Sequence, residues 1–582
     1  MKAKMSDNKK TIGLILEEIS IDYSAEIIHC VMKALSDCKD IKLVVMAGKQ
    51  EVEGEAVGNQ QKYNNVYNDV YKLKDCFDLD GMILTLPNLA GDSITDPGLL
   101  DFSSGIPKVF IASAVPGEVS VTYDNESGIR EAVDYLVRVK GFTNICMLGG
   151  REDNGDSIKR KEIFIRCLSD RGISFSDRQY EATDMSVNTL RQSRNLLNRN
   201  PGCEAIFCVN DQVASGLYEA MKERGLTPGK DIMVFGFDNT VISGNMVPPL
   251  ASIGSDSKSQ GQVAVELLTS MMDGKKVESV VLPTRLFGKE SLDYAKYIYS
   301  SREVLAGGEA VVNKMFDDCF YRYRIEAFNR ESVDLKRLFR EFISAMIKAM
   351  NQRYMSPEAF EELGRMIDVF FDNGAMRYTD ITKFTGCVNR LQNTMNFHQK
   401  SVSANVMNNR LFLRMRDRAI KSMAEQMIEE HRKHAEDDYN THRFIVESMV
   451  FGDEDSSDSR IVENFKQFGL MNAALYTFKE PVRHRNDSET VLPEYLNLRC
   501  VVKEGELYIM PPERMKSHIG RLCLREELST KCQSFTVFPV LCNDLIYGFL
   551  VCELDENIAR KGEMIAARIG VSLDISHRHG TR

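Results

Sequence analysis

The sequence has no C-x-x-C pair and no cluster of cysteine and histidine residues with the spacing of a zinc site. Its 14 cysteines are scattered from Cys30 to Cys552, and the closest two, Cys203 and Cys208, have no second pair that would complete four ligands. Thiols without a pattern are typical of a reducing compartment rather than of a disulfide-bonded secreted protein. We therefore expect buried thiols, no bound metal and a cytoplasmic location.

Long apolar runs are also absent. Residues 1–10 are polar and lack the apolar centre of a signal peptide. No later stretch approaches the roughly 20 apolar residues that a membrane-spanning helix needs. The sequence thus predicts no membrane partner, and the missing signal peptide argues against a solute-binding protein that serves a transporter.

Recognisable catalytic motifs are missing as well. None of the 9 histidines lies beside a serine or cysteine nucleophile motif. The chain contains no H-E-x-x-H sequence, no P-loop and no other nucleotide-binding glycine loop. We expect no catalytic residues, no cofactor and no enzymatic activity.

Positive charge is in deficit. The chain has 74 lysine and arginine residues against 84 aspartate and glutamate residues, and the net charge of −10 argues against a broadly basic, nucleic-acid-binding surface. The 43% hydrophobic and 27% charged residues are typical of a folded globular protein. At 582 residues, the chain is long enough for several domains, each with its own core.

The first half does contain a regular alternation of short β-branched runs and amphipathic helical patterns. Thr11–Leu16 predicts a buried strand, and Tyr23–Leu35 follows with apolar residues spaced for one helix face. Further strands are expected at 41–46, 81–84, 108–111, 119–122, 145–148, 205–209, 232–235 and 280–282. Such alternation predicts an α/β fold in which helices cover parallel sheets.

Polar residues directly follow several of these strands. In open parallel sheets, ligands settle outside the carboxyl ends of the strands, so residues at those ends are candidates for ligand binding. The residues in these positions are Glu18, Thr85, Asp124, Asn210 and Asp238.

Several short motifs follow one another in a fixed order along this half. They are V-T-Y-D-N-E-S-G-I-R-E-A from Val121, A-I-F-C-V-N-D-Q-V-A-S-G-L from Ala205, V-F-G-F-D-N from Val234 and L-P-T-R-L from Leu282. Together they resemble the ligand-binding part of lactose/galactose-type (LacI/GalR) repressors. The resemblance implies a two-lobed, type I periplasmic-binding-protein-like clam over residues 11–291, with a small effector held between the lobes.

The resemblance also implies residues for effector binding. An arginine presents a rigid fork of donors, and carboxylates and amides accept from or donate to hydroxyl groups, so such a set can satisfy a sugar, polyol or nucleoside removed from water. A tyrosine that matches a family aromatic would stack on an apolar ring face. The candidate set is Asp124, Arg160, Asn210, Asp238, Tyr23, Glu18 and Thr85.

Purely structural interpretations of these residues remain open. Arg160 would then form a surface ion pair, Asp124 would serve a turn, and Asn210 would cap a helix. The sequence also departs from the family pattern, because Ile21-Asp22 replaces the usual Asn-Pro and Ile163 replaces a usual glycine. The identity of the effector therefore stays open.

The part that reads DNA in such repressors is not expected here. Repressors of this family carry a helix-turn-helix and a hinge helix before the sensor, whereas only about ten residues precede the first predicted strand, too few for a DNA-binding fold. Two hypotheses follow, a sensor that feeds a different output and a solute-binding protein.

After Ser291 the pattern becomes helical. Residues 292–400 carry apolar side chains at intervals of three and four and predict a helical bundle. Residues 401–450 continue as a helix rich in lysine and arginine, which resembles the signalling or linker coiled coils of sensors. An amphipathic helix that packs locally is the alternative.

Residues 460–576 predict a small α+β domain. A loop rich in aspartate and serine is expected at Asp453–Ser459, and strands are expected at 474–478, 506–510, 534–541 and 547–554. The stretch from Phe535 to Leu554, with Asn543-Asp544 at its turn, resembles the central hairpin of GAF-type sensory domains. A hairpin of any other α+β domain would look similar.

Bacterial multidomain sensors with this order of parts often end in a diguanylate cyclase or a DNA-binding domain, and no Gly-Gly-Asp/Glu-Glu-Phe-like motif occurs here. The sequence therefore predicts a cytoplasmic regulator that senses a sugar-like effector and transmits closure of the clam to the C-terminal helical and GAF-like region. The alternative is a LacI-like transcriptional regulator that contacts DNA through an atypical or partner-supplied element. A homodimer and a downstream partner, either a protein or DNA, are expected.

Overall fold

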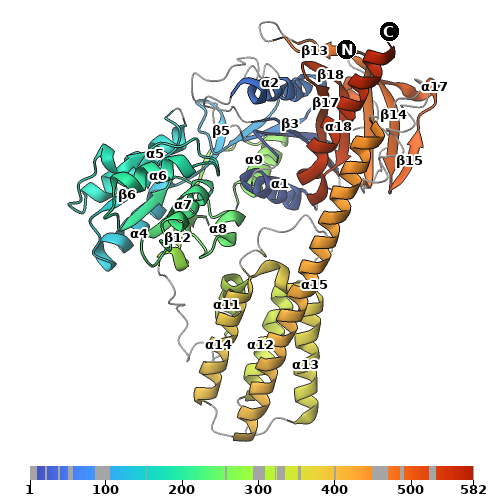
Figure 1. The fold of residues 1–582 in the computed structure, drawn as a ribbon. Helices are drawn as coiled ribbons and strands as arrows, with labels where there is room; N and C mark the ends of the chain where they lie inside the picture. Colours follow the sequence, from blue (N-terminus) through green and yellow to red (C-terminus); the bar gives the residue numbers. More distant parts are fainter. Residues whose placement is uncertain are drawn as a thin grey trace. The chain divides into compact units, whose positions relative to one another are not determined.

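The fold comes from a computed structural model (Figure 1). It describes residues 10–19, 22–36, 38, 40–49, 57–85, 105–152, 154–255, 259–292, 308–320, 323, 334–350, 356–398, 402–448, 470–485, 490–522 and 533–580. The chain forms two compact units: Met1–Asp293 together with Asn440–Arg582, and Tyr294–Tyr439. The loop expected at Asp453–Ser459 lies outside the described residues.

A parallel sheet forms the first lobe of the first unit, with strand order β11-β5-β4-β3-β1-β2. Its strands are short apolar runs, and all except β5 and β11 are buried along most of their length, as expected for a sheet covered on both faces. The strands are β1 (Lys10–Leu16), β2 (Ile41–Ala47), β3 (Gly81–Thr85), β4 (Lys108–Ile111), β5 (Val119–Tyr123) and β11 (Val280–Leu282). The helices are α1 (Asp22–Leu35), α2 (Val57–Tyr67), α3 (Leu73–Cys76) and α9 (Gln260–Met272), with a 3-10 turn at Asn68–Lys72.

A six-stranded sheet of order β12-β10-β9-β8-β6-β7 forms the second lobe. The chain passes between the lobes after β5, after β10 and after β11, as the strand order requires. The strands are β6 (Ile145–Leu148), β7 (Tyr180–Glu181), β8 (Ala205–Cys208), β9 (Met233–Phe237), β10 (Ala251–Gly254) and the antiparallel β12 (Arg285–Phe287). The helices are α4 (Asn125–Asp134), α5 (Gly155–Ser169), α6 (Leu190–Arg199), α7 (Asp211–Glu223) and α8 (Val241–Asn245).

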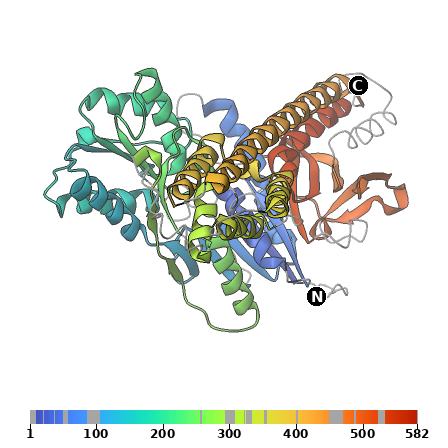
Figure 2. The same cartoon turned by 90° about the horizontal axis from the view of Figure 1, so that it is seen from below.

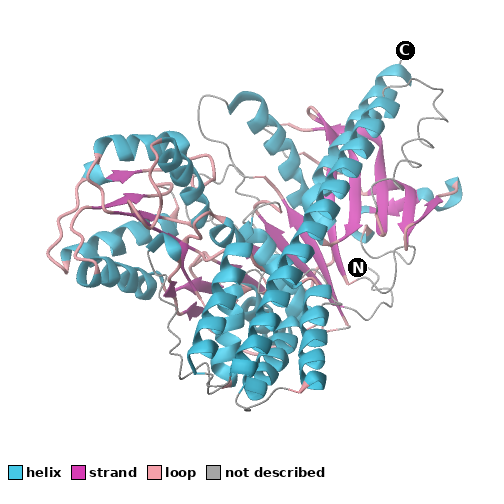
Figure 3. Ribbon diagram, turned by 60° about the horizontal axis from the view of Figure 1, so that its bottom comes forward, coloured by secondary structure: helices cyan, strands magenta, loops and turns pink. Residues whose placement is uncertain are grey.

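The C-terminal strands continue the sheet of the first lobe. Strand β17 (Ser534–Cys542) runs parallel to β2, pairing Leu43 with Ser534 and Met46 with Val537. Figures 2 and 3 show these strands beside those of the first lobe. The remaining elements are β13 (Asn472–Arg483), β14 (Tyr495–Lys503), β15 (Glu506–Ile509), α17 (Pro512–Met515), β16 (Lys516–His518), β18 (Leu545–Glu553) and α18 (Glu556–Gly580).

One hydrophobic core lies under the joint, by which we mean the place where β2 of the first lobe pairs with the C-terminal strand β17. Val44 and Met46 of β2 belong to the same buried cluster as Phe535 and Val537 of β17. Tyr67, which ends α2, is also buried in this cluster. The first lobe and the C-terminal strands therefore bury apolar surface together rather than as separate cores.

The second unit consists of helices with a core of its own. Phe316, Phe320 and Phe339 pack ring against ring at its centre, and Ser356 caps the helix that begins at Pro357. The helices are α11 (Glu309–Cys319), α12 (Leu335–Met350), α13 (Pro357–Asp372), α14 (Ile381–His398) and α15 (Val402–Ser448). In the parts of both units that the structure describes, no helix is long and apolar enough to cross a membrane.

Candidate functional site

Arg160 is the most deeply buried charged side chain of the candidate set. It lies on α5, which begins after the cap residue Asn154, and its side chain is 4% exposed. Its Nη1 donates to the carbonyl of Val209 at 2.8 Å, and its Nη2 donates to Asp238 at 3.1 Å. The guanidinium carbon lies 3.7 Å from the centroid of the Phe237 ring. The fork is therefore held between a carboxylate and an aromatic face, and it is not a surface ion pair.

The loop after β9 presents Asp238 in an unusual backbone conformation. Asp238 has φ +92° and Asn239 has φ +51°, a left-handed stretch that needs support from its surroundings. Asp211 supplies that support, because its carboxylate accepts from the N–H of Thr240 at 2.8 Å and from the hydroxyl of Ser252 at 2.6 Å. Burial raises the pKa of Asp238, and Arg160 opposes this rise.

Tyr23, on α1 of the first lobe, lies near the Asp238 carboxylate of the second lobe. Its hydroxyl donates to Gln260 at 2.7 Å, and Gln260 in turn donates to the carbonyl of Val121. Burial raises the pKa of Tyr23 above its usual value, and Tyr123 and the Asp238 carboxylate raise it further because they lie nearby. Tyr123 also contacts the second lobe, with its ring centroid 6.4 Å from that of Phe237.

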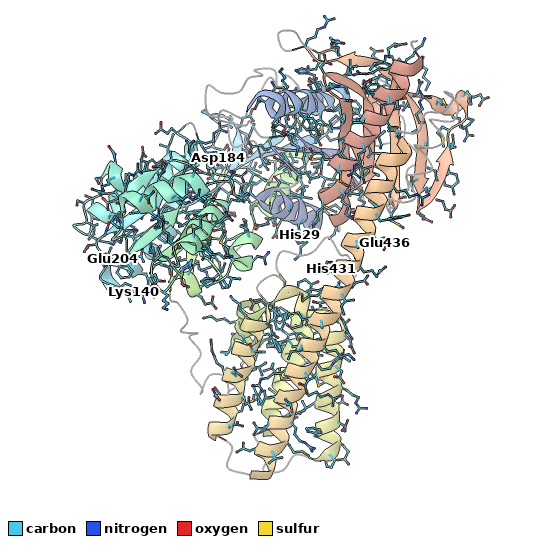
Figure 4. The ribbon with its side chains drawn as sticks, in the orientation of Figure 1. His29, Lys140, Asp184, Glu204, His431 and Glu436 are labelled. Atoms are coloured by element: carbon cyan, nitrogen blue, oxygen red, sulfur yellow. The ribbon has the colours of Figure 1, made fainter. Side chains whose placement is uncertain are left out.

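Two candidates serve as helix caps. Asp124 accepts from the backbone N–H of Glu126 at 2.9 Å and caps α4. Asn210 caps α7 by accepting from the N–H of Val213 at 2.9 Å. Its amide nitrogen donates to the carbonyl of Met185, next to the exposed Asp184 (Figure 4).

The neighbour of Asp124 contacts the arginine instead. Asn125 accepts from Nε of Arg160 at 3.1 Å and donates to Asp156 at 3.0 Å. Asn125 thus links the first turn of α4 to that of α5. The capping role of Asp124 fixes where this amide lies.

Glu18 and Thr85 lie at the carboxyl ends of β1 and β3 in the first lobe, but their contacts are structural. Glu18 accepts from Lys49 at 2.7 Å, and the buried Thr85 hydroxyl donates to the carbonyl of Ile15 at 3.4 Å. Lys49 also lies 2.6 Å from Glu563 of α18, so Glu18 belongs to a charge cluster at the joint with the C-terminal strands.

The structure therefore brings together Arg160, Asp238 and Tyr23 from the candidate set. Sequence reasoning missed the residues around them, which are Asn125, Asp156, Phe237, Gln260 and Asp211. Three of these were detectable, since Asn125, Phe237 and Asp211 each stand next to a candidate in the quoted motifs. Gln260 and Asp156 carry no comparable signal.

The chemistry available at this junction suits a polar, uncharged molecule. Arginine and asparagine donors, two carboxylates and the faces of Tyr123 and Phe237 can satisfy hydroxyl groups on one side and an apolar ring face on the other. Among the described residues, no group of three histidine, cysteine or acidic side chains is arranged to hold a metal ion.

Comparison with known proteins shows what this arrangement is similar to. Residues 133–292 match the family model of the periplasmic binding protein-like domain. This match and the regulators described next support a LacI/GalR-type, periplasmic-binding-protein-like sensor domain with parallel α/β sheets in the first half, as the sequence motifs predict.

Named relatives share this half of the chain. It is similar to catabolite control protein A of Priestia megaterium (26% identical over 295 residues, 49% of this chain and 82% of the relative). It is also similar to the HTH-type transcriptional regulator CelR of Thermobifida fusca (25% over 294 residues, 48% and 81%). The lactose operon repressor of Escherichia coli matches at 27% over 216 residues (37% and 58%).

Among solved structures, the chain is similar to a CelR–cellobiose complex, with 23% identity, a TM-score of 0.40 and coverage of 49% of this chain and 86% of that chain.

Proposed function

We propose that this protein is a regulator whose first half binds a small, sugar-like effector between its two lobes and passes the resulting lobe movement to the C-terminal region. The observation that carries the proposal is the buried Arg160 fork, held between Asp238 and the Phe237 ring where the lobes meet. The hydrogen-bond partners of Arg160 in the described residues belong to the second lobe, and the Tyr123 ring of the first lobe lies against Phe237 beside it. An effector between the lobes would therefore meet a preorganised donor next to an aromatic face. The arrangement supports regulation rather than catalysis.

The effector class follows from the side chains at this junction. Arg160 and Asn125 offer planar donors, Asp156 and Asp238 accept, and Tyr123 offers a flat apolar face. Hydroxyl-rich molecules with a ring, such as sugars, polyols and nucleosides, match this mixture. The name of one relative, the lactose operon repressor, is consistent with a sugar.

Transmission to the C-terminal region rests on the joint between β2 and β17. A lobe that rotates carries its edge strand with it, and β2 is hydrogen-bonded to β17 over four residue pairs. Lys49, which follows β2, bridges Glu18 of the first lobe and Glu563 of α18. The driving free energy is the effector's higher affinity for the closed lobes than for the open lobes.

A thermal-shift panel of mono- and disaccharides, polyols and nucleosides tests the binding site. We expect at least one compound to raise the melting temperature of the full chain, and Arg160→Ala to abolish that rise. Arg194→Ala is the matched control, since Arg194 forms an exposed ion pair with Glu223 away from the site. A rise that survives Arg160→Ala, or a panel without any response, contradicts the proposed site.

Because Arg160 is buried, a second variant separates binding from folding. Asp238→Asn keeps a side chain of the same shape and an acceptor for Arg160, but it removes the charge that faces the effector. Each ligand-induced shift is measured against the melting temperature of the same variant without ligand. We expect a reduced shift in Asp238→Asn even where its own melting temperature matches the wild type.

A second candidate function is transcriptional regulation on DNA. It is favoured by the names of the relatives, which include an HTH-type transcriptional regulator and a lactose operon repressor. DNA contact would then come from an atypical surface or from a partner, in a homodimer as the resemblance implies. Gel-shift titrations on the DNA upstream of its own gene test this, since no shift at low salt excludes direct binding there.

A further inference from the structure

Helix α15 carries a row of exposed apolar side chains. Val406, Leu413, Ile420 and Met427 follow one another at intervals of seven residues and are 55%, 56%, 56% and 62% exposed. A seven-residue interval drifts by only about 20° per repeat around an α-helix, so the four side chains stay on one face. We call these four residues the outer stripe.

The core of the helical unit uses a different face of α15. Leu411, Phe412, Met415 and Ala419 are buried in the cluster formed with α11 to α14. Leu413 and Ile420 point away from that cluster, as their exposure requires. Packing within the unit therefore accounts for the inner face and leaves the outer stripe in water.

The second part of α15 leaves the core altogether. From Ala424 to Tyr439, where the helical unit ends, no described side chain is buried, and His431 and Glu436 on this stretch are both exposed (Figure 4). Ion pairs such as those of Arg432 with Glu429 and Glu436 are contacts within the helix itself. A helix without a buried face is marginal in water, so this stretch calls for a partner.

We propose that the outer stripe is a self-association surface, at which α15 pairs with α15 of a second copy in parallel and in register. The seven-residue spacing supplies one of the two apolar positions of each coiled-coil heptad, and in a parallel pair such a residue packs against its own counterpart. Parallel pairing in register aligns all four apolar layers at once. The proposal concerns a surface separate from the effector site, so either can fail without the other.

The charges beside the stripe favour the parallel orientation. Asp417 and Arg416 lie on opposite sides of the stripe, and two parallel helices related by a two-fold axis bring opposite sides together. Asp417 then faces Arg416 of the second copy. Asp417 has no ion-pair partner among the described residues, and Arg416 donates there only to the amide oxygens of Asn389 and Gln392.

An antiparallel pair is disfavoured by the same charges. To align all four apolar layers, it must place Leu413 opposite Ile420 of the second copy, with the same sides of the two stripes in contact. Asp417 then meets Asp417 of the second copy, and like charges repel. The sequence around the stripe therefore selects the orientation as well as the surface.

Disulfide trapping in the full chain tests surface and orientation together. Leu413→Cys should form a covalent dimer under mild oxidation, because the two introduced thiols face each other in a parallel pair. Glu425→Cys, an exposed position off the stripe, is the matched control, and the unmodified chain controls for its own cysteines. A dimer that forms only when Leu413→Cys and Ile420→Cys chains are mixed overturns the parallel orientation, and no trapping at any stripe position overturns the surface.

Sedimentation equilibrium provides a measurement without added thiols. Ile420→Glu should raise the dimer dissociation constant by about tenfold or more, since it places like charges in an apolar layer. Asp417→Arg should weaken association, and the exchanged pair Asp417→Arg with Arg416→Asp should recover it. Circular dichroism checks that the exposed substitutions leave the helices intact. Unchanged association in Ile420→Glu contradicts the proposal.

Discussion

Lys49, the second residue after β2, lies 2.6 Å from the carboxylate of Glu563 on α18, the last helix of the chain. The same ammonium lies 2.7 Å from Glu18, which follows β1. Burial lowers the pKa of Lys49, but the two carboxylates more than compensate, and the pKa is raised overall. One cation thus holds two carboxylates, one from each side of the joint.

Replacing Lys49 with methionine should destabilise the protein by about 2 kcal/mol, because it leaves two partly buried carboxylates facing each other without a cation. The further change Glu563→Gln should recover part of this loss, so the two substitutions should be non-additive in a double-mutant cycle. Urea denaturation of the full chain measures the free energies of unfolding.

Lys10→Met is the matched control for this cycle. Lys10 pairs with Asp273 at 3.3 Å in the same lobe, but both side chains are well exposed to solvent. An exposed pair contributes little, so this variant should lie within about 0.5 kcal/mol of the wild type. Equal effects of Lys10→Met and Lys49→Met contradict the role given to the Lys49 cluster.

The joint also predicts how fragments of the chain behave. Residues 1–293 produced alone leave the edge of β2 unpaired and divide the shared core, so this fragment should aggregate or melt well below the full chain. Residues 294–439 have a core of their own and should keep their helical circular dichroism. A monomeric 1–293 fragment that melts with the full chain contradicts the shared core.

Asp211 should make stability depend on pH. Burial raises the pKa of Asp211 to about 7, from an ordinary value near 3.8. Between these values the folded chain keeps a proton that the unfolded chain has lost. The stability contributed by this group is therefore greatest below about pH 4, falls as the pH rises towards 7, and changes little above that.

Asp211→Asn removes this titration. The free energy of unfolding of the wild type, minus that of Asp211→Asn, should fall between pH 5 and pH 8. Asp184→Asn, at an exposed position in the same lobe, should leave the wild-type pH profile unchanged. Parallel pH profiles for wild type and Asp211→Asn exclude the proposed titration.

Local patterns in the sequence predicted strands β17 and β18, but they did not predict which strands pair with one another. The strands expected at 534–541 and 547–554 correspond to β17 and β18, since alternating and β-branched residues mark a strand wherever it lies. No feature of the sequence predicts that β2 pairs with β17. A strand as apolar as β2 has the same residue pattern whether its outer edge faces solvent or another strand. The likeness of residues 460–576 to GAF domains stays a prediction.

At the candidate site, too, the sequence predicted some residues, whereas the roles of others depend on the fold. Position after a strand identified Asp238, but it could not distinguish a side chain that caps a helix, such as Asp124, from one that contacts Arg160, such as Asn125. The role of Asp211 depends on a loop with positive φ, and only the fold reveals that loop.

The most direct test of the central claim is hydrogen–deuterium exchange of the full chain, with and without the compound that gives the largest shift in the thermal panel. If effector binding is transmitted across the joint, exchange should slow within residues 10–292 and also in the peptides of β17 and α18. In Lys49→Met, the change should be confined to the first half of the chain. A wild-type response that stops at residue 292 contradicts transmission to the C-terminal region.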